Sequence, residues 1–257
     1  QTRVALGKDP DNKNIVVRWR TGDKVLLFFQ KPDGSVVAGD ETTITIVPDT
    51  DSKKATFDVI LPAGVTAPCT VYLVHGATAA TDGSKIEVDV SPVGFKKLDE
   101  LVTPLTGKVE VVSGSSVGAI PLHHLGALQC LTLVNYWENA FTATLELSYT
   151  AGDEWFYKAG SKYDLISESV TNIGSGTTPW QEVSVPATQA VLFAQWVMPN
   201  GNIPPVIGLK AGSLVSSNQK SARSAGLERG RAYHLYGSAN YYHTDLKFAE
   251  PLVWAGS

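Results

Sequence analysis

The chain has 257 residues, of which 43% are hydrophobic and 18% are charged, and this balance is typical of a folded globular protein. Lys and Arg total 21 against 25 Asp and Glu, giving a formal net charge of −4 without any run of five like charges. We therefore expect no nucleic-acid partner. Because no apolar stretch approaches the ~20 residues that a membrane-spanning helix needs, we also expect no transmembrane segment.

The sequence begins at Gln1, without an initiator Met or an apolar leader. We interpret the chain as a mature or trimmed product whose targeting segment is missing. Its length exceeds the usual domain size of about 100–150 residues, which favours two domains or one large β unit.

Alternation of apolar and polar residues with a period of two is the strongest pattern in the chain, and it is typical of strands with one buried face. Residues 15–20 and 24–29 flank Thr21, Gly22 and Asp23, and this arrangement predicts a β-hairpin. Turn residues separate the later strands. We predict these strands over residues 43–47, 55–61, 70–75, 86–90, 108–112, 128–134, 143–149, 190–196 and 231–236.

Residues 95–102 carry the one helical pattern. Phe95, Leu98, Leu101 and Val102 would share a helix face, and Pro104 would stop the helix. Short strands separated by turn residues are typical of β-sandwiches and barrels, whereas parallel sheets would need crossover helices. The sequence therefore predicts an all-β fold.

A change in composition divides the predicted strands into two groups. Residues 113–116, Ser-Gly-Ser-Ser, interrupt the alternation before a new apolar set begins at Ile120. We expect one β-sandwich domain over residues 1–117 and a second over residues 118–257. The predicted core residues are Trp19, Phe57, Tyr72 and Val88 in the first domain, and Leu131, Leu133, Leu145, Leu147 and Tyr233 in the second.

The two cysteines, Cys69 and Cys130, belong to no metal-ligand spacing. We expect both to be buried free thiols, because separate cores would hold their Cα atoms beyond the ~7 Å that a disulfide tolerates. One disulfide is the alternative.

The histidines are His75, His123, His124, His234 and His243. A metal site on the adjacent pair is disfavoured, because neighbours on a strand point to opposite faces and no HxH or HExxH spacing accompanies them. We interpret the histidines as structural or solvent-exposed, and we expect no metal ion.

Catalytic motifs are not apparent either. Ser115 follows Gly114, but two residues rather than one precede Gly118, and the strand-to-helix context of a nucleophile elbow is lacking. No glycine-rich phosphate-binding motif occurs. The carboxylate pairs Asp99-Glu100 and Asp153-Glu154 are expected in turns or on a short helix, not as the facing carboxylates of a glycosidase. We expect no enzyme activity and no cofactor.

Aromatic residues offer the one other candidate site. The residues concerned are Trp155, Phe156, Tyr157, Trp180, Tyr241 and Tyr242, the last of which stands beside His243. Exposed Trp and Tyr rings can stack on sugars and mark binding sites. Two sandwich cores could also absorb these rings, so both interpretations stay open and no binding residue is assigned.

A series of motifs recurs in a defined order along the chain. Thr2-Arg3-Val4 is followed by a strand that ends at Trp19, then by Gly22-Asp23 and an apolar strand. The later motifs are Ala55-Thr56-Phe57 before Leu61-Pro62, Tyr72, Leu98-Asp99-Glu100-Leu101, Leu122-His123-His124-Leu125 before a strand ending at Asn135, and Leu227-Glu228-Arg229-Gly230-Arg231-Ala232-Tyr233. From residue 2 to about residue 236 the chain thus resembles the fimbrillin-like surface proteins of Bacteroidales.

This resemblance implies two tandem Greek-key, transthyretin-like β-sandwich domains and a non-enzymatic role in fimbriae or adhesion. It implies export as a lipoprotein to the outer membrane and cell surface, with other fimbrial subunits or host or bacterial surface ligands as partners. The lipid-bearing Cys of such precursors is absent here, so a lipid anchor in the precursor is an expectation. Residues 250–257 also run past the family's last strand.

Strand addition at an open sheet edge is the mechanism that we expect, because such an edge offers unpaired backbone groups in register. Candidate donor segments are residues 2–7 and 248–254. Phe248, Leu252 and Trp254 share one face of an extended chain, and Pro251 favours an edge position. In the alternative interpretation the tail completes its own domain, and the rival function is a surface glycan-binding module that uses the exposed Trp and Tyr residues.

Overall fold

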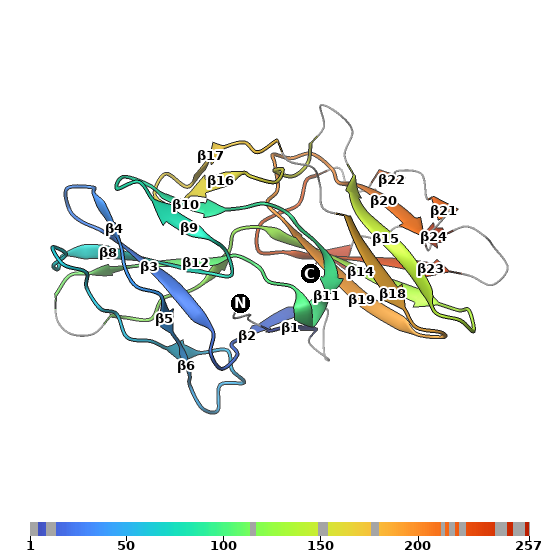
Figure 1. Ribbon diagram of the computed structural model, residues 1–257, viewed down its shortest axis with the longest axis horizontal. Helices are drawn as coiled ribbons and strands as arrows, with labels where there is room; N and C mark the ends of the chain where they lie inside the picture. The colour runs from blue at the N-terminus through green and yellow to red at the C-terminus, as the bar shows by residue number, and fades with distance from the viewer. Residues whose placement is uncertain are drawn as a thin grey trace.

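The structure is a computed structural model that describes residues 5–8, 14–113, 117–148, 154–175, 180–211, 214–215, 219–220, 225–239, 246–248 and 255–256. Strands form nearly all of its regular structure, and the one helix among these residues is the 3₁₀ segment η1 (Leu98–Glu100). The strands are arranged in two lobes, with a further sheet above the first lobe (Figure 1). The predicted all-β fold is confirmed.

The first lobe is built on the N sheet. Its order is β13 (His123–His124), β12 (Leu105–Val111), β8 (Cys69–His75), β3 (Lys24–Gln30) and β4 (Val36–Ala38), and β5 (Thr42–Thr43) pairs with the start of β3. The ribbons β1 (Ala5–Lys8) with β2 (Ile15–Arg18) and β6 (Thr45–Ile46) with β7 (Ala55–Thr56) lie beside it. The bridging sheet above it has the order β17 (Ser169–Asn172), β16 (Lys162–Asp164), β10 (Ile86–Asp89) and β9 (Ala79–Thr81).

The second lobe is a sandwich of two sheets. The C sheet has the order β11 (Val93–Lys97), β19 (Ala190–Val197), β14 (Ala127–Asn135), β23 (Ala232–Ala239) and β24 (Leu246–Phe248), and β25 (Ala255–Gly256) also pairs with β23. The outer sheet has the order β18 (Trp180–Val185), β15 (Phe141–Ser148), β20 (Val206–Ala211) and β21 (Leu214–Val215), and β22 (Gln219–Lys220) pairs with β20. β14 and β23 run parallel, which brings the chain's last long strand into the middle of the C sheet.

The N sheet is buried on both faces. One face contributes to an apolar cluster that we call the N core, which contains Val25, Leu27, Phe29, Val71 and Leu73. The other face contributes Phe28, Tyr72 and Val74 to a second cluster, the central core. A strand covered on both sides needs a continuous apolar run rather than alternation, and this explains why residues 25–29 are apolar throughout.

The C sheet is likewise covered on both sides. Leu128, Cys130, Ala194 and Trp196 enter the central core. The opposite face, which includes Ala127, Val197 and Tyr233, packs with Trp155 and Phe156 inside the second lobe. The central core therefore lies between the two lobes and joins them.

Three strand pairs in the described structure connect residues before and after position 117. β10 pairs with β16, β11 with β19, and β12 with β13. The central core also draws on both sides of that position, for example through Val88 and Trp196. The two halves thus share sheets and one apolar cluster, and the division into domains 1–117 and 118–257 stays a prediction.

Six of the nine predicted core residues are buried, and two are half-buried. Tyr72, Val88, Leu131, Leu133, Leu145 and Tyr233 are each less than 8% exposed. Trp19 and Phe57 are half-buried against the N core. The side chain of Leu147 lies outside the described residues.

The helix predicted over residues 95–102 is wrong. β11 pairs with β19 up to Lys97 with a register shift along the strand, η1 follows, and Leu101 is already extended. Phe95, Leu98 and Leu101 are buried as the pattern required. An irregular strand followed by a 3₁₀ turn reproduces a helical spacing of apolar residues, so periodicity alone could not distinguish the two.

The β-hairpin predicted for residues 15–20 and 24–29 is wrong, because β2 pairs with β1 while β3 pairs with β4, β5 and β8. The turn expected between the two strands does form at Thr21 and Gly22. Gly22 has φ of 87°, a conformation that favours glycine. The carboxylate of Asp23 accepts a hydrogen bond from the backbone N–H of Arg20 at 2.7 Å. The ring of Trp19 packs edge-on against His75, with 5.0 Å between ring centroids. These residues therefore shape the turn and cover the end of β8.

The carboxylate of Asp164 links two strands of the bridging sheet, β16 and β10, through a side-chain hydrogen bond. Its carboxylate accepts hydrogen bonds from the backbone N–H of Ile86 (2.9 Å) and from both the N–H (3.0 Å) and the hydroxyl (2.7 Å) of Ser167. Burial opposes ionisation and is the largest single influence on its pKa, but the donors together outweigh it and hold the pKa below the ordinary value. Because Ile86 begins β10 and Asp164 ends β16, this carboxylate links the two halves of the sequence.

We expect Asp164→Ala to lower the free energy of unfolding by about 2–3 kcal/mol, because buried N–H groups lose their acceptor. Asp82→Ala is the matched control, since Asp82 binds Ser84 and Lys85 in the same manner within an exposed loop; its loss should be within about 0.5 kcal/mol. Urea denaturation at neutral pH measures both.

The pKa of Asp164 is lower in the folded chain than in the unfolded chain. The stabilisation by this carboxylate is therefore complete above about pH 4 and is lost as the pH falls through the folded pKa. Equal losses in the two variants would contradict the assignment.

Both cysteines are free and buried, as predicted. Cys69 belongs to the N core and Cys130 to the central core. Burial raises the pKa of the Cys130 thiol to about 12 and also raises the pKa of Cys69. The reactive thiolate form is therefore suppressed at both positions.

We expect the native chain to react with a thiol-specific chromogenic reagent only as fast as it unfolds, and to release two equivalents of product at once in concentrated urea. Rapid modification of either thiol under native conditions would argue against this burial. A mass two daltons below that of the reduced chain would reveal a disulfide.

Candidate functional site

The described histidines occupy separate environments. His75 is 2% exposed, and its Nδ1–H donates to the carbonyl of Lys24 at 2.7 Å. His123 is exposed and His124 is half-buried, as expected for neighbours on a strand. His234 is 3% exposed, and His243 lies outside the described residues. Within the described chain, His, Cys, Asp and Glu side chains form no group of three that could hold a metal ion.

The candidate carboxylates do not face one another across a site. Asp99 and Glu100 are exposed on η1. Glu154 forms an ion pair with Lys158 at 3.3 Å, while Asp153 and Ser115 lie outside the described residues. No helix in the described portion is long and apolar enough to cross a membrane.

The aromatic residues singled out from the sequence do not form a platform where they are described. Trp155 and Phe156 are each 1% exposed and pack edge-on against one another, with 4.7 Å between centroids. Tyr157 is half-buried against the central core. Of the two interpretations left open, core packing is therefore the one that holds for Trp155 and Phe156, and a glycan platform at Trp155 is excluded. The side chain of Trp180 and both Tyr241 and Tyr242 lie outside the described residues.

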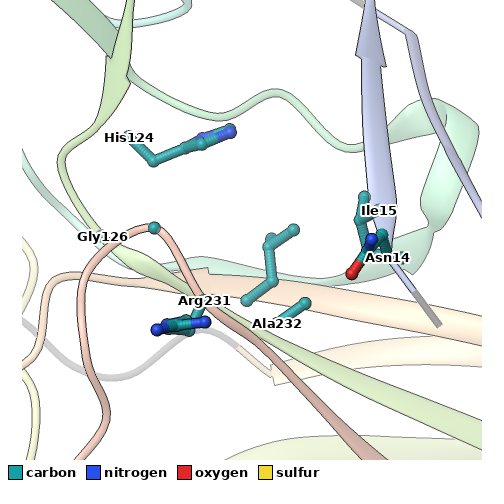
Figure 2. A pocket seen from close by; sticks show the side chains of 8 residues that line it. Asn14, Ile15, His124, Gly126, Arg231 and Ala232 are labelled. Atoms are coloured by element: carbon teal, nitrogen blue, oxygen red, sulfur yellow. The ribbon is translucent and has the colours of Figure 1, made fainter. Parts of the chain in front are cut away.

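A hollow of about 370 Å³ lies between the lobes (Figure 2). Its lining comes from the starts of β2, β14 and β23 and from β13, and consists of Asn14, Ile15, His124, Gly126, Leu128, Gly230, Arg231 and Ala232. Arg231 already has the carboxylate of Glu228 at 3.7 Å. The positive charge of Arg231 is thus partly neutralised by Glu228. We interpret the hollow as a gap where sheets meet rather than as a site for a charged ligand.

His124, which is half-buried, stands in the wall of this hollow (Figure 2). Burial, and to a lesser degree the neighbouring His123, lower the pKa of His124 below its ordinary value. The folded chain therefore prefers a neutral His124 ring.

The predicted N-terminal donor segment is held by its own chain where it is described. Ala5 to Lys8 pair with Ile15 to Arg18 in an antiparallel ribbon. Leu6 is 3% exposed and belongs to the central core. Detaching this strand would expose a buried leucine, which costs about 2 kcal/mol in addition to the lost pairing.

The C-terminal tail lies at the edge of the C sheet. Phe248 faces Gly237, while Ala255 faces His234. Residues 249–254, which include Leu252 and Trp254, lie outside the described residues. The described pairing agrees with a tail that completes its own sheet.

Several strands of the described structure form sheet edges, among them β4, β9, β11 and β17, and two further edges are considered for strand addition. β12 pairs with β13 only at Leu105 and Thr106, so residues 108–111 have a partner on the β8 side alone. β18 is the edge of the outer sheet. Exposed charges stand on these edges, namely Lys108, Glu110 and Glu182, and edge charges commonly protect open strands from unspecific pairing.

We expect the stability of the chain to fall as the pH drops below about 6.5, because the unfolded His124 takes up a proton there while the folded ring resists it. His124→Gln should reduce the difference in unfolding free energy between pH 7.5 and pH 5.5. His123→Gln, which changes the exposed neighbour, should largely retain it. Urea titrations at the two pH values measure this difference, and an unchanged pH dependence in His124→Gln would contradict the burial of this ring.

Solved structures with a similar fold are candidate cell adhesion proteins of Bacteroides. The crystal structure of one from Bacteroides ovatus ATCC 8483 aligns with a TM-score of 0.54 and 13% identity, covering 99% of this chain and 96% of that chain. Another, from Bacteroides uniformis ATCC 8492, aligns with a TM-score of 0.52 and 14% identity, covering 96% of each chain. No protein-family model and no curated protein sequence matches the chain.

At this level of identity the likeness concerns the fold alone. It extends over almost the whole of both neighbours, so the arrangement of both lobes is shared. The resemblance to Bacteroidales surface proteins that the sequence motifs indicated is confirmed at the level of the fold.

Proposed function

We propose that this chain is a non-enzymatic fimbrial subunit or adhesin of the cell surface, which assembles or adheres by adding strands at exposed sheet edges. The observation that carries the proposal is the fold shared over nearly full length with candidate cell adhesion proteins of Bacteroides. The partners would be other fimbrial subunits or host or bacterial surface ligands. Export as a lipoprotein to the outer membrane, with the lipid on a precursor segment, belongs to the same proposal.

The acceptor in this proposal is the outer edge of β12 at residues 108–111. In the described structure these residues pair with β8 on one side only. Val112, directly after the strand, is 72% exposed, so an added strand would cover apolar surface as well as pair with backbone groups. Main-chain pairing supplies affinity in such a contact, and alternate side chains supply register.

The donor is the C-terminal tail, residues 246–257. In the described structure the tail pairs with β23 through β24 and β25. We assign the donor role to the tail rather than to β1, because detaching β1 would expose the buried Leu6. Phe248, Leu252 and Trp254 would then fill alternate pockets along the acceptor edge.

Deleting residues 246–257 tests the donor role. We expect the truncated chain to keep a cooperative thermal transition near that of the parent while losing self-association in sedimentation experiments. A synthetic peptide of residues 244–257, added in excess to the parent, should compete with assembly. The matched control peptide carries Ser in place of Phe248, Leu252 and Trp254, and it should not compete.

A truncated chain that melts much earlier, or fails to fold, would show that the tail is needed by its own lobe and would exclude the donor role. A parent chain that stays monomeric in the presence of its own tail peptide, without binding the peptide, would exclude strand addition.

A further inference from the structure

Two loops lie side by side at the end of the second lobe farthest from the N sheet, at the lower right of Figure 1. Residues 136–140 connect β14 to β15, and residues 186–189 connect β18 to β19. The backbone N–H of Thr188 donates to the carbonyl of Trp137 at 3.0 Å, which joins the loops. We call them the tip loops.

Asn135 holds the tip loops in one arrangement. Its side chain is 1% exposed. The Nδ2 group donates to three backbone carbonyls, those of Asn139 (2.9 Å), Val185 (3.2 Å) and Pro186 (2.9 Å). The Oδ1 atom accepts from the backbone N–H of Trp137 at 2.8 Å. A buried amide whose donors and acceptor are all used makes the backbone around it rigid, and a rigid loop loses less entropy when it binds a ligand.

The residue directly after Asn135 carries an exposed aromatic ring. Tyr136 is 57% exposed, and it is the one aromatic residue among the large exposed apolar side chains of the described chain. Its neighbour Trp137 is half-buried and packs edge-on against Phe141, with 5.6 Å between ring centroids. Trp137 therefore anchors the loop, while Tyr136 presents its ring to solvent.

The surroundings of Tyr136 are polar and carry a single charge. The exposed residues of the tip loops are Tyr136, Glu138, Asn139, Ala140, Pro186, Thr188 and Gln189. Their side-chain amides and hydroxyl can donate hydrogen bonds to sugar hydroxyl groups or accept bonds from them, and the carboxylate can accept such bonds. A stable protein contact would need roughly 800 Å² on each side and several apolar anchors. One ring with a polar rim matches a smaller partner that has an apolar face and hydroxyl groups around its edge.

We propose that the tip loops bind a neutral carbohydrate, with the C–H face of one sugar ring stacked on Tyr136. Asn139, Thr188 and Gln189 hydrogen-bond the sugar hydroxyl groups, and Glu138 disfavours anionic sugars. The site uses none of the aromatic residues that the sequence pattern singled out. Neither the β12 edge nor the tail contributes a residue to it, so the site can be tested on the monomeric chain.

The test is saturation-transfer difference NMR on the full chain with methyl glycosides of galactose, mannose and N-acetylglucosamine, followed by titration of those that bind. We expect at least one glycoside to bind in the millimolar range. Tyr136→Ala should weaken this binding by about tenfold or more, while Tyr136→Phe, which keeps the ring face, should retain it within about threefold. Ile173→Ala, at another exposed apolar position, is the control that should change nothing.

The absence of binding by the parent chain to all three glycosides would overturn the proposal, and so would binding that Tyr136→Ala leaves unchanged. If Tyr136→Ala abolishes self-association while no glycoside binds, the tip loops contact protein and the proposal is wrong. Thermal melts of each variant verify that the exposed substitutions leave the fold intact. Tail deletion measures assembly separately, so each proposal can fail without the other.

Discussion

Burial of the central core, to which the N sheet and the C sheet each contribute one face, is the constraint on which the rest of the structure depends. Trp196, Cys130 and Ala194, all 0% exposed, form the middle of the central core. Removing a side chain the size of Trp196 from such a core costs about 3–5 kcal/mol, which is a large part of the stability of an ordinary protein. Because this face must be covered, β1, η1 and the bridging sheet are packed around it instead of forming a self-contained first lobe.

Much of the fold could be predicted from the sequence, because period-two alternation indicates strands with one buried face and one solvent-exposed face. Ile86 and Val88, which alternate with exposed or half-buried neighbours, are an example. The partners of these strands could not be predicted. Neither Val88 nor Tyr163 carries a sign that β10 pairs with β16 across the middle of the sequence. Strand pairing is decided by which apolar faces cover one another, and single-strand patterns do not contain that information.

The candidate sites were less accessible to sequence reasoning than the fold. Clustering of aromatic residues in the sequence drew attention to Trp155 and Phe156, which are buried. Tyr136 is exposed because it follows a strand end at which Asn135 turns the chain, and an Asn-aromatic-aromatic sequence between two strands was the one available signal. The open edge of β12 had no sequence signal, because an edge is defined by a missing neighbour.

The two proposed contacts constrain one another. A tail that leaves the second lobe and an acceptor edge on the first lobe form a heterologous contact, which builds an open filament unless the rotation between subunits closes a ring. β24 begins beside Ala239, which is itself paired with Asn135, so the donor starts within about two strand spacings, roughly 10 Å, of the tip loops. A subunit whose tail is inserted into its neighbour would bring that neighbour against its own tip loops. Carbohydrate binding through Tyr136 would then be confined to the subunit at the free end of a filament, where the tail remains on its own sheet.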